Sequence, residues 1–86
     1  MSEISRFFGI IIAMYWREHG IPHFHEKYGE FRGVFRIDNL ELMEGVLPKR
    51  VISLILEWAF QHRQELKDNW DLAMDFEELK RIEPLE

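Results

Sequence analysis

The sequence predicts an α+β domain in which an antiparallel sheet from the N-terminal half packs against C-terminal helices. Its length of 86 residues suits one domain. The first half carries alternating β-branched and aromatic runs, whereas the second half carries apolar residues at helical spacing. We therefore expect a single domain over residues 1–86, with three or four strands and either one long helix or two shorter ones.

Strand-forming segments fill the first half of the chain. The expected strands cover residues 8–16, 23–28, 31–37 and a short fourth segment, 40–44. The first is apolar on both faces, which favours a central position in the sheet. Gly29-Glu30 separates two alternating runs and therefore predicts a hairpin. The result is an antiparallel meander.

Helical periodicity begins after Pro48, a residue that suits the first position of a helix. From Val51 to Phe60 apolar residues cover most of the circumference, which predicts a largely buried helix. A narrower apolar stripe continues through Leu66, Trp70, Ala73 and Met74. The pattern allows one helix or two with a break between residues 62 and 68. Residues 78–85 are a candidate edge strand.

The absence of cysteine excludes a disulfide scaffold and a thiolate metal site, and it suits a reducing compartment. The apolar stretch near the N-terminus is short, and Glu3 stands where a signal peptide is basic. Apolar runs fall well short of the roughly 20 residues of a membrane span. We expect a cytoplasmic protein without a membrane segment.

The net charge of −5 is unevenly distributed. Residues 1–50 carry seven basic and seven acidic side chains, whereas residues 51–86 carry four basic and nine acidic ones. Non-specific nucleic-acid binding normally needs a basic face, so it is not expected. A local basic patch could still form from Arg32, Arg36, Lys49 and Arg50, and the acidic segment could meet a basic partner.

Histidines at positions 19, 23 and 25 are the most conspicuous chemical feature. Residues two apart on a strand share a face, so His23 and His25 should project together, and His19 could fold back toward them. Three imidazoles suit zinc or another first-row metal with a position left for water. Nearby carboxylates that could join them are Glu18, Glu26 and Glu30. The alternative is that these histidines only stiffen the turn at Pro22.

A metal-free site is the second chemical hypothesis. His23 or His25 would act as a general base, because histidine titrates near neutral pH. Arg32 and Arg36 would hold an anionic substrate, with Tyr28 as a further candidate binding residue. The serines lie in no nucleophile motif, and the five glycines form no phosphate-binding loop.

Several segments resemble a known family. They are Ile4-Ser5-Arg6-Phe7-Phe8-Gly9-Ile10, Met14-Tyr15, His19-x-x-Pro22-His23-Phe24-His25-x-x-Tyr28-Gly29, Glu44-Gly45-x-Leu47-Pro48, Glu57-Trp58-Ala59, His62-Arg63-x-Glu65-Leu66 and Asn69-Trp70. Together they resemble the bacterial family catalogued as domain of unknown function 4160, over nearly the whole chain. That family has no established biochemical activity, so the resemblance assigns no catalytic role to any histidine.

The resemblance implies a small prokaryotic protein, often encoded beside a second small family, domain of unknown function 2442. That arrangement resembles a toxin–antitoxin pair. We therefore expect a protein–protein interaction module that acts as one member of a two-protein regulatory pair, and a second copy of the chain is another candidate partner. The alternative is a small histidine- or metal-dependent hydrolase or nuclease that uses His19, His23 and His25.

Overall fold

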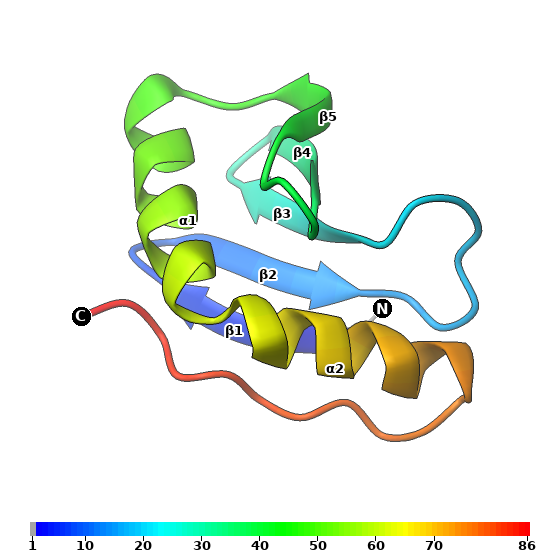
Figure 1. Cartoon of the computed structure of the whole chain (residues 1–86). Helices are drawn as coiled ribbons and strands as arrows, with labels where there is room; N and C mark the ends of the chain where they lie inside the picture. Colours follow the sequence, from blue (N-terminus) through cyan, green and yellow to red (C-terminus); the bar gives the residue numbers. More distant parts are fainter. Residues whose placement is uncertain (1) are drawn as a thin grey trace.

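The computed structural model describes residues 2–86 as one antiparallel sheet and two helices (Figure 1). The sheet has five strands in the order β1-β2-β3-β4-β5. The elements are β1 (Ser2–Phe7), β2 (Ile10–Met14), β3 (His23–Tyr28), β4 (Phe31–Arg36), β5 (Leu42–Val46), α1 (Lys49–Gln61) and α2 (Arg63–Met74). The α+β class is confirmed, but the expected three or four strands are too few.

The additional strand is β1, which the sequence reading missed. Phe8 and Gly9 both have positive φ, 49° and 80°, and form a two-residue turn between β1 and β2. Such a turn needs φ > 0 at both central residues. Glycine adopts this conformation at little cost, whereas for Phe8 it is sterically unfavourable. The aromatic Phe8 resembles a strand residue, so the expected strand 8–16 ran through the turn that separates β1 from β2.

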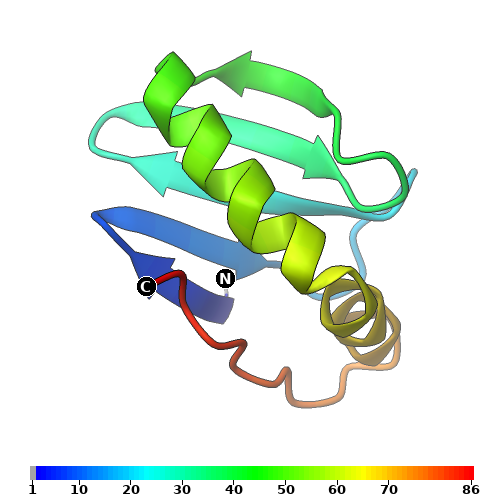
Figure 2. The same cartoon turned by 60° about the vertical axis from the view of Figure 1, so that its left-hand side comes forward.

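The two-helix alternative is confirmed, with the break at His62, between α1 and α2. Pro48 precedes α1 with φ −58° and ψ 147°, so it lies just outside the helix rather than at its first position. Figure 2 shows α1 crossing one face of the sheet. No helix within residues 2–86 combines the length and hydropathy that a membrane crossing needs.

The core lies between α1 and the sheet face that carries Phe24 and Phe35, whose rings stack at 5.8 Å. Trp58 from α1 is fully buried, and its ring lies 5.3 Å from Phe7 and 6.3 Å from Phe24. Burial of each large apolar side chain contributes about 1.5–3 kcal/mol. The helix-facing side of the sheet is therefore devoted to packing.

Residues 75–86 return beside β1 without forming a strand within the described chain (Figure 1). One backbone hydrogen bond joins them to β1, from the Ile82 N–H to the Ile4 carbonyl oxygen at 2.8 Å. Asn69 holds the segment through both backbone groups of Lys80. Side-chain hydrogen bonds take the place of a regular backbone hydrogen-bond ladder with β1. The expected edge strand at 78–85 is therefore wrong, although the segment does lie along the edge of β1.

The opposite sheet face presents a different set of side chains. Pairing across the strands aligns Ala13, His25 and Val34 in one row. The next row contains Ile11, Lys27 and Arg32. Members of these rows are half-buried or exposed apart from Ala13, in contrast to the fully buried Phe24 and Phe35. This face therefore presents His25, Lys27 and Arg32 beside a few apolar side chains, instead of a continuous packed core.

A candidate metal centre

The loop between β2 and β3 is fastened to the end of α2. The backbone N–H of Arg17 donates to the Ala73 carbonyl oxygen at 3.2 Å, and the indole N–H of Trp16 donates to the Glu77 carbonyl oxygen at 3.0 Å. Arg17 adopts a left-handed backbone conformation with φ 54°. These contacts fix the path of the chain just before Glu18, whose side chain turns toward β3.

Glu18, His23 and His25 form the candidate centre, which we call the Glu18 cluster. The two histidines project from β3 with ring centroids 5.2 Å apart. Oε1 of Glu18 lies 3.0 Å from Nε2 of His23 and 2.6 Å from Nε2 of His25. One ligand atom from each residue lies within 4.8 Å of the other two. The cluster therefore gathers two imidazole nitrogens and a carboxylate oxygen.

The hydrogen bonds of His23 determine which of its nitrogens carries a lone pair. Nδ1 lies 2.6 Å from the Ile21 carbonyl oxygen, which only accepts, so Nδ1 must be the donor. A neutral His23 then directs the lone pair of Nε2 at the carboxylate of Glu18. Two acceptors face each other unless the imidazole is doubly protonated or a cation lies between them.

Aromatic side chains hold both imidazoles in place. Tyr15 packs edge-on against His25 with ring centroids 4.6 Å apart, and Trp70 of α2 lies 5.0 Å from His23. The His23 side chain is only 10% exposed, whereas those of His25 and Glu18 are 25% and 30% exposed. The cluster is thus anchored on its His23 side and accessible from its His25 side.

Not every histidine expected at the site joins the cluster. His19 is exposed and does not belong to the group of converging ligand atoms found within residues 2–86. Glu18, one of three carboxylates suggested by the sequence, lies there instead. Glu30 is exposed in the β3–β4 turn. His62 contacts Glu65 and Trp58, so it belongs to a separate environment on the helices.

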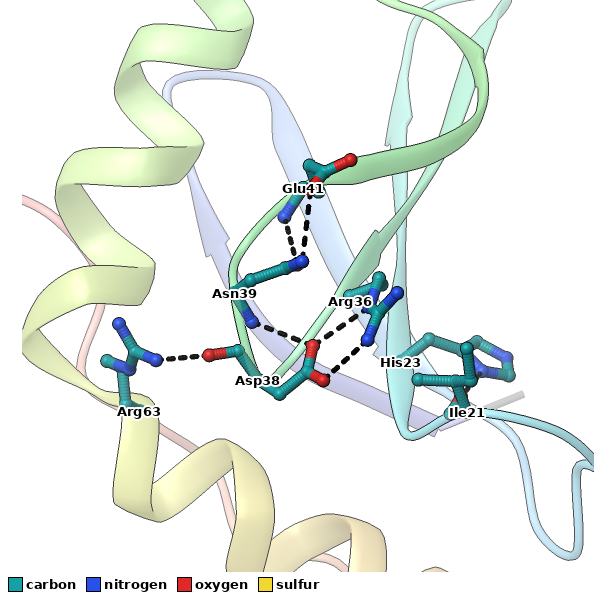
Figure 3. Close-up of polar contacts among 7 residues, drawn as sticks. All are labelled: Ile21, His23, Arg36, Asp38, Asn39, Glu41 and Arg63. Atoms are coloured by element: carbon teal, nitrogen blue, oxygen red, sulfur yellow. Dashed lines mark hydrogen bonds and ion pairs between the residues drawn. The ribbon is translucent and has the colours of Figure 1, made fainter.

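The candidate binding residues separate into different places. Arg32 shares a pocket with His25. Figure 3 shows Arg36 bonded through Nε and Nη2 to the carboxylate of Asp38, at 2.9 and 2.6 Å. Tyr28 lines another hollow, at the start of α1, away from the Glu18 cluster. Arg36 pairs with His23 across the sheet, but its guanidinium is bound to Asp38, so Arg32 is the one of these three that shares a pocket with a histidine of the cluster and has no carboxylate partner within residues 2–86.

Two further residues of this face were not singled out by the sequence reading. Lys27 lies two residues after His25 and pairs directly with Arg32 across the hairpin. Tyr15 packs on His25 from the end of β2. The position of Lys27 follows from the expected hairpin, because a two-residue turn fixes which residues face each other. The position of Tyr15 depends on the loop path and has no such local signal.

Glu26 lies on the helix-facing side of β3, opposite to its neighbour His25. It is 2% exposed, and neither carboxylate oxygen accepts a hydrogen bond of normal geometry within residues 2–86. A methyl group at Gly33 would come within 2.9 Å of its Oε1, which places the carboxyl against that glycine. Burial raises the pKa of Glu26 well above its usual value, and the backbone N–H of Phe35 offsets only part of the effect.

The fold and the cluster define a small α+β protein with a candidate metal centre on one sheet face. Comparison with protein families matches residues 9–71 to the family described as Domain of unknown function (DUF4160). The chain belongs to this family. Searches of curated proteins and of solved structures returned no match.

Proposed function

We propose that the protein is a small metal-dependent hydrolase that binds zinc or another first-row divalent metal at Glu18, His23 and His25. The observation that carries the proposal is the hydrogen bond from Nδ1 of His23 to the Ile21 carbonyl oxygen. It leaves Nε2 of a neutral His23 as a lone-pair donor. Metal-binding histidines commonly donate their other ring N–H to a backbone carbonyl in this way.

The ligand types and their spacing support a catalytic ion. Two imidazoles and one carboxylate suit zinc, and three protein ligands leave a fourth position for water. Two atoms that each lie about 2.1 Å from a tetrahedral ion are about 3.4 Å apart. The contacts of Glu18 with His23 and His25, at 3.0 and 2.6 Å, approach this spacing. A small outward shift of the loop-borne Glu18 carboxylate would make room for the ion.

An ion at this position would supply a nucleophile. Bound zinc lowers the pKa of its water to about 7, so hydroxide is available at neutral pH. The oxygen of that water forms the new bond to the substrate, the leaving group departs with the electron pair of the broken bond, and a proton from water neutralises it. The exposed side of the cluster at His25 and Glu18 gives a substrate access.

Elemental analysis of the untagged protein tests the ion directly. After incubation with zinc and dialysis, the natural protein should retain about one ion per chain. The His23→Ala/His25→Ala protein should retain none, and Glu18→Ala should bind more weakly because it loses one of three ligands. His19→Ala and His62→Ala are matched controls, since both remove an imidazole outside the cluster, and both should keep the ion.

The competing explanation is a doubly protonated His23 that forms a purely structural ion pair with Glu18. In that case the natural protein retains no stoichiometric metal, and the proposal fails. Metal retained by the His23→Ala/His25→Ala protein would also overturn it. Circular dichroism identifies a variant that has lost its fold, and Glu18→Ala, a change on a surface loop, then provides the decisive comparison.

Hydrolytic activity needs a separate measurement. The zinc-loaded protein should hydrolyse at least one class in a panel of chromogenic carboxylic esters, phosphomonoesters and phosphodiesters. A chelator and the His23→Ala/His25→Ala changes should both abolish that activity. If the protein binds stoichiometric zinc but neither the chelator nor the histidine substitutions reduce its activity, the ion is structural and not catalytic.

An interaction module remains the second candidate, as one member of a toxin–antitoxin-like pair. Exposed large apolar side chains on β5 and α1 support it, because such side chains are common at binding surfaces. On the edge strand β5, Val46 is 72% exposed and Met43 is 40% exposed, and Phe60 of α1 is 70% exposed. A partner strand could add to the β5 edge through main-chain hydrogen bonds.

Co-expression tests this second function. The partner is a protein of the domain of unknown function 2442 family, if one is encoded beside this chain. Co-purification, with a complex mass measured by light scattering, is expected, and Val46→Lys on β5 should weaken it. Two proteins that elute separately would reject the pair. Light scattering of the chain alone would reveal a homo-oligomer.

A further inference from the structure

A small pocket adjoins the Glu18 cluster on the same sheet face. It has a volume of about 110 Å³, and His25 contributes to its wall. Ile11 and Ala13 of β2 and Val34 of β4, the strands on either side of β3, provide an apolar floor. The pocket therefore lies beside one of the proposed metal ligands.

Two cationic side chains lie at the other side of this pocket. Lys27 of β3 and Arg32 of β4 both line it, both are exposed, and they pair directly across the two strands. Like charges directly opposite each other destabilise a sheet. An anion between them would remove that repulsion, so the arrangement favours a negatively charged ligand.

Among the ion pairs of residues 2–86, Lys27 and Arg32 have no carboxylate partner, whereas Arg6 and Arg36 each have one. Nη1 of Arg32 donates to the carbonyl oxygens of Gly29 and Phe31, which steadies the guanidinium. Its other N–H groups make no hydrogen bond with the part of the chain that the structure describes. They are available for an anion.

We propose that this pocket binds the phosphate group of a small phosphate ester. Lys27 and Arg32 together carry two positive charges, which match a phosphomonoester dianion, and guanidinium groups bind phosphate oxygens in pairs. An organic group can cover the apolar floor at Ile11 and Val34. A nucleic acid is disfavoured, because the net charge of −5 opposes a long polyanion.

This inference deepens the proposed hydrolase by naming its substrate class, and it rests on that function for its chemical step. The water oxygen attacks phosphorus, the ester P–O bond breaks, and the departing alcohol oxygen takes the proton. Binding of the phosphate group by Lys27 and Arg32 does not require the metal. The two proposals can therefore fail separately.

Calorimetric titration of the metal-free protein with inorganic phosphate and with phenyl phosphate tests the pocket. Both should bind, and phenyl phosphate should bind more tightly because its ring covers the apolar floor. Lys27→Ala/Arg32→Ala should weaken both by about 10- to 100-fold, since each lost charge-assisted hydrogen bond costs about tenfold. Lys49→Ala/Arg50→Ala, which removes the same charges from the start of α1, is the matched control and should bind normally.

The zinc content of Lys27→Ala/Arg32→Ala distinguishes the two failures. If this variant retains normal zinc and binds phosphate as tightly as the natural protein does, the phosphate pocket is wrong and the proposed metal centre is still supported. Phosphate binding that depends on Lys27 and Arg32, in a protein that retains no zinc, would support the pocket and overturn the hydrolase. A single-stranded oligonucleotide that binds more tightly than phenyl phosphate would overturn the assignment to small esters.

Discussion

Two polar clusters at neighbouring positions of the sheet differ in how their donors and acceptors are matched. The Asp38 cluster (Arg36, Asp38, Asn39, Glu41 and Arg63) gathers around the turn between β4 and β5. The Glu18 cluster joins the β2–β3 loop to the first residues of β3. In the Asp38 cluster both carboxylate oxygens and the backbone carbonyl oxygen of Asp38 accept hydrogen bonds from N–H donors (Figure 3). In the Glu18 cluster two histidine nitrogens meet one carboxylate oxygen.

The difference lies in whether the protein itself supplies a donor for each acceptor. The Asp38 carboxylate accepts hydrogen bonds from Arg36 and from the backbone N–H of Asn39, so the protein itself satisfies both of its oxygens. In a neutral His23, Nδ1 holds the ring proton, so Nε2 is an acceptor, and the Glu18 oxygen that it faces offers it no proton. Functional sites are expected where a fold leaves binding capacity unused.

Zinc should stabilise the protein through the Glu18 cluster alone. A ligand at 100 times its Kd, bound only to the folded state, adds about 2.7 kcal/mol to the free energy of unfolding. For a domain of this size that corresponds to a rise in Tm of roughly 10–20 °C. Thermal unfolding with zinc or a chelator measures it. Glu18→Ala should lose most of this rise and Asp38→Asn should keep it; equal rises in both variants would contradict the contrast.

The buried Glu26 should give a pH-dependent loss of stability. Its pKa is raised in the folded state by burial, so the unfolded chain releases this proton first as the pH rises from about 4. The free energy of unfolding therefore falls between the unfolded and folded pKa values. The Glu26→Gln variant has no proton to release there and should not lose this stability. Its free energy of unfolding at neutral pH should exceed that of the natural protein by on the order of 1–2 kcal/mol, within the range for unpaired buried polar groups.

Urea unfolding in the presence of a chelator, at several values between pH 4 and pH 7, checks this prediction. The advantage of Glu26→Gln should be smallest at the acid end and grow toward neutrality. Glu30→Gln, the same substitution at the exposed β3–β4 turn, is the control and should show no such trend. An advantage that stays constant with pH would mean that the Glu26 carboxyl is not the cause.

Local pattern predicted most of the fold. The span of β3, His23–Tyr28, was predicted to the residue, because alternation and the Gly29-Glu30 turn fix it. The same hairpin register brings Lys27 opposite Arg32. Arg36 is a candidate substrate-binding residue in the sequence, yet Asp38 follows two residues later and binds it, so a local signal for this ion pair is present in the sequence.

The Glu18 cluster follows from the sequence only in part, because the position of one of its residues depends on a distant contact. Two of the three residues, His23 and His25, follow from strand alternation. The choice of Glu18 over His19 depends on where the β2–β3 loop is fastened. Its anchor is the hydrogen bond from Arg17 to Ala73, between residues far apart in the sequence. Local periodicity carries no information on such contacts.

Tyr15 should tune the Glu18 cluster without supplying a ligand. Its ring lies edge-on to His25, with an interplanar angle of 85°, an arrangement worth about 0.5–1.5 kcal/mol. Tyr15→Ala should therefore weaken zinc binding by about 2- to 10-fold. Tyr15→Phe keeps the aromatic contact and should bind as the natural protein does. Competition with a chromophoric chelator measures both; weakening in the Phe variant would instead assign a role to the hydroxyl.

Replacement of Asp38 should have the smallest effect, because its ion pair with Arg36 lies at the surface, where water and salt screen the attraction. Arg36 lowers the pKa of Asp38, so the pair contributes at neutral pH and its contribution is lost as the pH falls through the lowered value. Asp38→Asn should reduce Tm slightly at neutral pH and low salt, and the difference from the natural protein should shrink in high salt and in acid. Zinc and phosphate binding should not change. A change in either would mean that the Asp38 cluster communicates with the metal centre through His23, which pairs with Arg36 across the sheet.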